Sequence, residues 1–296
     1  MGDFVVITDS TCDLSQEMLD EYEIDYTPMN YSIGTEEYPA LLDWSVHSPK
    51  EFYDFMRCGT IIKTSQVATA CYEDHFTKWL EMGKDILYIS CSSALSGSIN
   101  VARLVAKNLA STYPNRIICC VDSLISSLGQ GYLTMLAAKL RKEGRGITET
   151  ANEIEAIKLH VNQFGTVDSL EYLRRAGRVT AASSFFGNFF GIKPILISDR
   201  IGQNYAIRKV KGAANTRMEI AKEIQAVVES PETQCLYISH ADALGDAEKL
   251  RDEIMKLVPF QDCYIGNIAP IVGASVGPGT VIAFCLGKEV TIEGGN

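Results

Sequence analysis

The sequence lacks the features that mark most metal-binding, nucleic-acid-binding and membrane proteins. It contains no apolar run long enough to span a bilayer and no Lys/Arg run longer than a pair. Its four histidines are scattered singly, and no C-x-x-C pair occurs although the chain has nine cysteines. Together with a formal net charge of −10, these absences predict no metal site, no nucleic-acid partner and no stable insertion into a membrane.

Signatures of nucleotide binding and of hydrolysis are missing as well. No P-loop pattern G-x-x-x-x-G-K-[ST] occurs, and Gly129-Gln130-Gly131 begins like a dinucleotide-binding loop but meets Thr134 where the third glycine should stand. Ser96 lies outside a G-x-S-x-G elbow, because Ala94 and Ser98 occupy the two glycine positions. We therefore expect no cofactor and no catalytic residue.

Several cysteines fall within apolar, strand-like runs, as at 117–121 and 284–286. Buried free thiols of this kind are typical of proteins in a reducing compartment. The first strand is expected to begin at Phe4, with no apolar leader before it. These features predict a cytoplasmic protein.

A strand, a serine-rich turn and a helix follow one another between residues 86 and 109. The apolar run 86–89 predicts a buried strand, and the apolar residues of 98–109 recur at helical spacing. The turn 90–97 would place hydroxyl groups and free backbone N–H groups at a helix N-terminus, which suits an anion. The alternative is that Ser96 only caps the helix.

Strands alternate with helices through residues 1–150, which predicts a three-layer α/β domain with a mainly parallel sheet. Helices are expected at 15–22, from 49 onward, at 69–82 and at 131–143, with an extended segment at 24–33 and a loop at 35–47. Polar turns at 9–10, 92–96 and 122–123 follow strands, and the carboxyl ends of parallel strands meet at one sheet edge. We expect a ligand at that edge, although Ser and Asp are also common turn residues.

Residues 151–296 mix strands and helices in an order that predicts a second domain, of α+β type with a mixed sheet. A hairpin is expected around 199–203 and a small, aromatic-rich helix at 181–190. The segment 273–280 reads as a glycine-rich loop, either a plain turn or a place where the backbone closely approaches a ligand.

A series of these segments resembles the motifs of the DegV family of bacterial fatty-acid-binding proteins. In chain order they are 7–11, 64–66, 92–98, 121–123 with 129–131, 169–178, 191–196 and 276–280. Each segment is short, but the ordered set spans nearly the whole chain. The resemblance implies two α/β domains with one long-chain fatty acid between them, which is presented to a separate ATP-dependent fatty acid kinase that phosphorylates the carboxylate.

The resemblance also implies site residues. Thr64 and Ser96 match the hydroxyls that bind the fatty-acid carboxylate, with Ser65 and Gly97 beside them. Arg178 matches an arginine near the headgroup. Ser275 stands where the family commonly has a histidine, so it could donate a hydrogen bond but carries no positive charge.

An acyl tail needs an apolar lining, and the residues proposed for it are Phe185, Phe186, Phe189, Phe190, Ile195 and Leu196. Their alternative role is ordinary core. At ~0.8 kcal/mol per buried CH₂, about fourteen methylenes would contribute at most roughly 11 kcal/mol, so the tail would supply most of the binding energy.

Two rival functions remain open from the sequence. One is a hydrolase or phosphotransfer enzyme that uses Asp9, Ser96 or Ser123. The other is a regulatory module that senses a lipid without passing it on. The interpretation preferred here is a carrier with no chemistry of its own.

Overall fold

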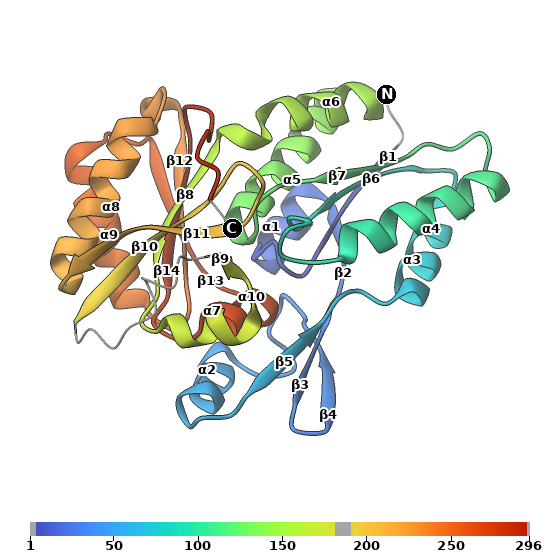
Figure 1. Ribbon diagram of the computed structural model, residues 1–296. Helices are drawn as coiled ribbons and strands as arrows, with labels where there is room; N and C mark the ends of the chain where they lie inside the picture. The colour runs from blue at the N-terminus through green and yellow to red at the C-terminus, as the bar shows by residue number, and fades with distance from the viewer. Residues whose placement is uncertain (1–3, 181–190, 295–296) are drawn as a thin grey trace.

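A parallel sheet of four strands organises the first half of the chain in the computed structural model, which describes residues 4–180 and 191–294 (Figure 1). In spatial order the strands are β2 (Ile24–Thr27), β1 (Phe4–Asp9), β6 (Asp85–Ser90) and β7 (Ile118–Asp122). Helices α3 (Thr69–Glu81) and α4 (Ser98–Thr112) pack on one face, and α1 (Gln16–Tyr22), α5 (Ser127–Lys142) and α6 (Ile147–Ile157) pack on the other. The expected parallel sheet is confirmed.

A small antiparallel sheet follows β2, and here two expectations were wrong. Its spatial order is β4 (Glu36–Pro39), β3 (Asn30–Ile33) and β5 (Ile62–Ser65). The segment 24–33 is therefore two strands in different sheets, and the expected loop 35–47 contains β4. A hairpin turn at Gly34, whose φ is +63°, joins β3 to β4 and is too short to show as a break in the apolar pattern.

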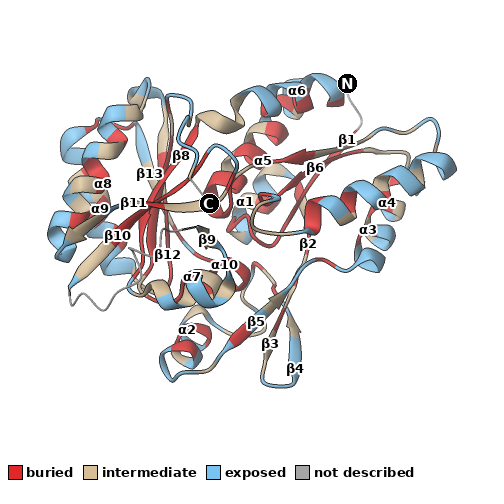
Figure 2. Cartoon of the chain, viewed as in Figure 1, coloured by how far each residue is buried: buried red, intermediate tan, exposed pale blue. Residues whose placement is uncertain are grey.

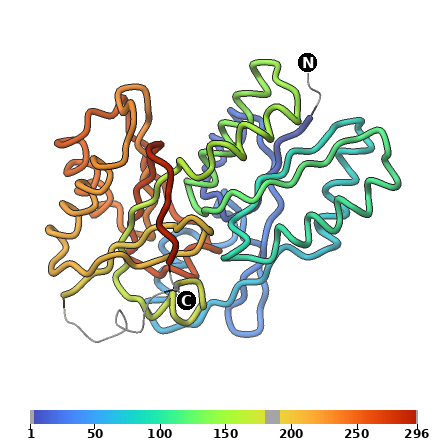
Figure 3. The backbone as a smooth tube through the Cα atoms, turned by 45° about the horizontal axis from the view of Figure 1, so that its top comes forward, coloured from blue at the N-terminus to red at the C-terminus, as the bar shows by residue number. Residues whose placement is uncertain are grey.

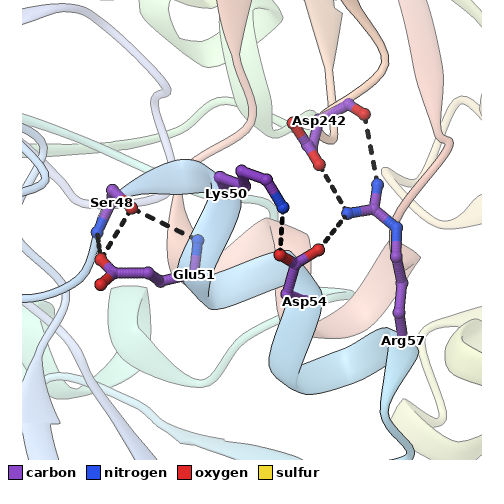
Figure 4. A network of polar contacts seen from close by, with 6 residues as sticks. All are labelled: Ser48, Lys50, Glu51, Asp54, Arg57 and Asp242. Carbon is purple, nitrogen blue, oxygen red and sulfur yellow. Dashed lines mark hydrogen bonds and ion pairs between the residues drawn. The ribbon is translucent and has the colours of Figure 1, made fainter.

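Helix α2 (Pro49–Arg57) illustrates how local chemistry fixes an element (Figure 4). Ser48 and Glu51 form a capping box: the Glu51 N–H donates to the Ser48 hydroxyl, and the Glu51 carboxylate accepts from the Ser48 N–H at 2.9 Å. At the other end, Arg57 pairs with Asp54 of the same helix and with Asp242, which follows the strand β12 (Cys235–His240) in the second half of the chain. The helix is thereby tied to the second half of the chain.

The second half forms a mixed sheet, as expected (Figure 1). Its described strands are, in spatial order, β13 (Asp262–Asn267), β12 (Cys235–His240), β14 (Val281–Leu286), β8 (Val161–Thr166), β10 (Ile192–Ser198), β11 (Asn204–Lys211) and β9 (Val179–Thr180). Helices α8 (Ala213–Val227) and α9 (Leu244–Leu257) pack against the strands. The expected hairpin is confirmed, because β10 and β11 pair antiparallel from Ser198↔Asn204 onward.

Helix α5 lies between the two larger sheets and contacts strands of both. Figure 2 shows the buried residues on this helix and on the neighbouring strands, and Figure 3 shows its green segment between the two halves of the chain. A Cβ at Gly131 would lie 2.7 Å from the Cys12 carbonyl oxygen, and one at Gly129 would lie 3.0 Å from Cδ1 of Phe284. The glycine pair that resembled a nucleotide loop therefore serves close helix packing.

The expected glycine-rich loop at 273–280 was wrong for its first half. Residues 273–276 belong to the helix α10 (Pro270–Val276), which begins with a proline at its first position. Only the turn after it has the left-handed backbone that favours glycine, with φ of +80° at Gly277 and +81° at Gly279. Helix α10 packs on α7 (Leu170–Ala176) and reaches β3, β5 and α2.

Two further expectations, the domain division and the helix at 181–190, stay predictions. The proposed division of the chain between residues 150 and 151 remains a prediction, and it falls inside α6, which packs on β6 and β7. The expected helix at 181–190 lies outside the described residues.

Asp13 connects three parts of the fold from a buried position. Its Oδ1 accepts the Ala269 N–H at 2.9 Å, just before α10, and its Oδ2 is bonded to the hydroxyl of Ser127, the first residue of α5. That hydroxyl lies 3.0 Å from the hydroxyl of Ser239 on β12. Burial raises the pKa of Asp13 from 3.8 to about 8.

This pKa predicts a pH-dependent stability. Between about pH 4 and pH 8 the folded chain keeps the Asp13 proton while the unfolded chain has lost it, so the free energy of unfolding should fall as pH rises through that window. Asp13→Asn removes this contribution. Urea denaturation of both proteins from pH 5 to pH 9 should show the wild type losing stability relative to the variant, and parallel curves would contradict the assignment.

Candidate functional site

The residues predicted to hold a carboxylate meet at one cavity of about 160 Å³. The predicted residues among its lining are Thr64, Ser65, Ser96, Gly97, Arg178 and Ser275. They come from β5, from the turn before α4, from the loop after α7 and from α10. The cavity lies where these elements meet α5, β8 and β14, between the two larger sheets.

The turn between β6 and α4 forms one end of the cavity, which is called the anion-binding end below because its hydroxyl and N–H donors could hold an anion. The Ser96 hydroxyl accepts the Ser98 N–H at 3.3 Å and lies 3.0 Å from the Ser98 hydroxyl. The helix N-cap itself is Gly97, whose N–H has no acceptor in the described part of the chain. Ser96 thus assists the helix start and also faces the cavity, and the partial positive charge of a 15-residue helix is aimed at the same place.

Thr64 lies opposite this turn, on the strand β5. Its backbone pairs with Tyr31, and its hydroxyl has no hydrogen-bond partner among the residues that the structure describes. Thr64, Arg178 and Ser275 also line a second cavity, of about 310 Å³, which includes the cationic side chains of Lys63 and Arg175. These three residues therefore stand at the boundary between the inner cavity and a wider outer cavity.

Arg178 is held against the turn that carries Ser96. Gly177 ends α7 in the left-handed conformation, with φ of +67°, and turns the chain toward the cavity. The Nε of Arg178 then donates to the Leu95 carbonyl at 3.2 Å. The side chain is exposed, yet it brings a guanidinium to the anion-binding end.

Ser275 projects from α10 rather than from a loop. Its hydroxyl is 3.5 Å from the Ile271 carbonyl of the preceding turn, a long bond that leaves it able to donate elsewhere. The position of α10 depends on Tyr53, which donates to the Ile268 carbonyl at 2.6 Å. A Cβ at Gly273 would lie 2.4 Å from the same tyrosine oxygen.

The inner wall of the cavity differs from the predicted tail lining. Ile195 is fully buried in the core that includes Ile220 and Ile224 of α8, and Leu196 packs in the other core cluster; neither lines the cavity. Their role in the tail lining stays a prediction, because alternation along β10 shows which residues are buried but not which of them face a ligand. Phe185, Phe186, Phe189 and Phe190 lie outside the described residues.

Sequence reasoning missed most of the wall that the structure shows. The apolar part is Met29, Leu95, Ile271, Val272, Val276 and Ile282, and the more polar part is Thr11, Gln66, Cys91, Ser126, Gln163 and Asn204. These residues come from the turn after β1, from the segment between β2 and β3, from the N-cap of α5 and from β8, β11, β14 and α10, as well as from the predicted elements. Four of them, Thr11, Gln66, Leu95 and Val276, lie inside the motif segments quoted from the sequence, but only the folded chain shows that they line the cavity.

Two residues of the rival enzyme hypothesis lie away from this wall. Asp9 is fully buried, and its carboxylate accepts from the Thr11 N–H at 3.0 Å, from the Tyr88 hydroxyl at 2.9 Å and from Gln130 at 3.2 Å. The buried Ser123 hydroxyl donates to the Ile125 carbonyl at 2.9 Å. Both side chains are engaged in holding the turns of the sheet edge.

Comparison with known proteins agrees with this geometry. A family model described as "Uncharacterised protein, DegV family" matches residues 3–288. The chain belongs to the DegV family. A DegV domain-containing protein of Clostridium perfringens is 34% identical over 287 residues, which cover 97% of this chain and 98% of that protein. A relative from Streptococcus pyogenes is 32% identical over 287 residues, with coverage of 97% and 99%.

Solved DegV structures share the fold across the whole chain. A DegV family protein from Thermus thermophilus, described by its fatty acid binding, superposes with a TM-score of 0.87 at 25% identity and covers 97% of this chain and 100% of its own. DegV of Bacillus subtilis, described as a fatty acid binding protein, superposes with a TM-score of 0.82 at 25% identity and the same coverage. The expected DegV fold, with its parallel and mixed sheets, is confirmed.

The described residues form neither a metal-binding cluster nor a membrane-spanning helix. Within residues 4–180 and 191–294, no three or more His, Cys, Asp and Glu side chains are placed to hold a metal ion. In the same part of the chain, no helix is both long and apolar enough to cross a membrane.

The contact between Gly273 and Tyr53 gives a test of how α10 is placed. Gly273→Ala should destabilise the protein by about 1–3 kcal/mol through overpacking, and Tyr53→Phe by about 1–3 kcal/mol because a buried carbonyl loses its donor. In the double variant the clashing oxygen is gone, so the combined loss should be clearly smaller than the sum. Chemical denaturation of the four proteins measures this, and additive losses would refute the packing account.

Proposed function

We propose that this chain binds one long-chain fatty acid, with its carboxylate at the hydroxyls of Thr64 and Ser96 and its tail in the cavity between the sheets. The observation that carries the proposal is the convergence of these hydroxyls with the free Gly97 N–H and the Arg178 guanidinium at the boundary of one interior cavity. Fatty acid binding described for solved DegV proteins supports the same conclusion.

The chemistry of the two ends suits such a ligand. A carboxylate is ionised at neutral pH and must be hydrogen-bonded when it leaves water. The anion-binding end offers hydroxyl and N–H donors with one arginine at its rim, so the head can be bound without full burial of an ion pair. Behind it, the wall of the cavity of about 160 Å³ includes the apolar side chains of Ile271, Val272 and Ile282, against which an acyl chain can pack.

We further propose that the chain presents the acid to a separate fatty acid kinase in the cytoplasm. A carboxylate held by Thr64 and Ser96 would stand beside the outer cavity, which is open and carries Lys63 and Arg175. A phosphoryl donor could approach from that side while the tail stays enclosed. The cationic rim would favour an anionic donor in a protein whose net charge is −10.

Removal of the hydroxyls tests the head assignment. Thr64→Val and Ser96→Ala should each weaken fatty acid binding roughly 10- to 100-fold, because each removes a hydrogen bond to a charged group. Thr64→Ser keeps the hydroxyl and should bind nearly as the wild type does. Mass spectrometry of organic extracts and titration with a long-chain acid provide the measurements, and full retention in the double variant would refute the assignment.

Presentation to a kinase has its own test. The acid-loaded chain, mixed with ATP and a bacterial fatty acid kinase, should yield acyl phosphate, while the Thr64→Val/Ser96→Ala double variant should yield little at equal concentration. Phosphate release assays and mass spectrometry follow the product. If the wild type binds acid but never supports phosphorylation, the lipid-sensing alternative holds instead.

A further inference from the structure

Two polar side chains that line the cavity are buried and do not belong to the residues predicted to hold the carboxylate. Ser126 is 9% exposed and Gln163 is 5% exposed, and both line the cavity together with Ile282. Neither borders the outer cavity, whose residues are those of the rim. If the carboxylate occupies the rim, the groups that meet Ser126 and Gln163 belong to the acyl chain.

Ser126 has a hydroxyl without a partner. The residue stands at the N-cap of α5, but its side chain makes no cap hydrogen bond, and no other described residue bonds to it. Its backbone is extended, with φ of −138°, while the helix begins at the following residue. The hydroxyl is therefore a free donor and acceptor in the cavity wall.

Gln163 has a free acceptor, and the surrounding network fixes which atom it is. Its Nε2 donates to Oδ1 of Asn204 at 3.3 Å, and Nδ2 of Asn204 donates to the Arg178 carbonyl at 3.1 Å. Because Asn204 must direct its nitrogen toward that carbonyl, its oxygen faces Gln163. The Oε1 of Gln163 is left without a donor in the described part of the chain.

These two atoms disfavour a plain hydrocarbon tail. Methylene groups that cover a hydroxyl and an amide oxygen exclude water and offer no hydrogen bond in return. A site with buried polar groups discriminates against ligands that leave those groups unpaired. The wall is therefore suited to a chain that carries a polar group of its own.

We propose that the preferred ligand is a long-chain hydroxy fatty acid, whose chain hydroxyl donates to Oε1 of Gln163 and accepts from the Ser126 hydroxyl. This specificity rests on the proposed fatty acid binding and refines it. A keto group would accept from Ser126 but leave Gln163 unpaired, and a double bond would satisfy neither. The expected order of affinity is hydroxy acid, then keto acid, then plain acid.

A positional series provides the test. The delipidated full chain is titrated with stearic acid, with hydroxystearic acids that carry the hydroxyl at successive mid-chain positions, and with the matching ketostearic acids. At least one hydroxy acid should bind about tenfold tighter than stearic acid, and its neighbours in the series less so, because the hydroxyl must reach both atoms.

Two variants assign the preference to the residues named. Ser126→Ala and Gln163→Leu should each lower the ratio of the affinity for the best hydroxy acid to the affinity for stearic acid several-fold, and the double variant should reverse the order of the two acids. Ser65→Ala, next to Thr64, should affect hydroxy and plain acids equally, because both carry the same carboxylate.

Each outcome decides a separate claim. Stearic acid binding as tightly as every hydroxy acid would overturn the chain specificity while leaving the proposed function intact. A hydroxyl preference that survives in the double variant would overturn the role of Ser126 and Gln163. Failure of every acid to bind would overturn the proposed function itself.

Discussion

The close packing of α5 between the two larger sheets is the constraint on which the cavity depends. Gly129 and Gly131 let this helix approach Phe284 of β14 and the Cys12 carbonyl, distances at which any side chain would collide. With α5 so close, its N-terminal end and the polar turns of the parallel sheet face the strands of the mixed sheet. The space left between these surfaces is the cavity, so its position depends on helix packing as well as on the turns that line it.

The anion-binding end is assembled from segments far apart in the chain. Arg178 bonds to the Leu95 carbonyl across 83 residues, and Tyr53 fixes α10 through the Ile268 carbonyl across 215 residues. The buried Asp13 carboxylate links the starts of α5 and α10, because it is bonded to the Ser127 hydroxyl and accepts the Ala269 N–H. Several such long-range bonds, rather than one dominant interaction, hold the hydrogen-bond donors of the anion-binding end in position. The geometry is therefore a property of the folded chain as a whole.

The parts of the fold and of the site that could be predicted from the sequence are those that leave a strong pattern in neighbouring residues. Buried strands such as β1 and β6 and capped helices such as α2 have strong local patterns, so they were predicted correctly. The four-residue strands β4 and β5 were not recognised because they show little alternation, and α10 was mistaken for a loop because its glycine serves a contact with Tyr53. The predicted carboxylate-binding residues do share one cavity, whereas Ile195 and Leu196 do not line it. The pattern of neighbouring residues indicates which side chains are buried, but only the folded structure shows which buried side chains line the cavity and which belong to the core.

The path Gln163–Asn204–Arg178 has a consequence for how such a protein can diverge. The amide of the inner wall holds Asn204, and Asn204 in turn holds the backbone of the arginine at the rim. A substitution that re-tunes the wall for another chain therefore also loosens the arginine that meets the head. Selectivity for the two ends of the ligand is not independently adjustable, so changes at position 163 should accumulate together with compensating changes at 204 or 178 rather than alone.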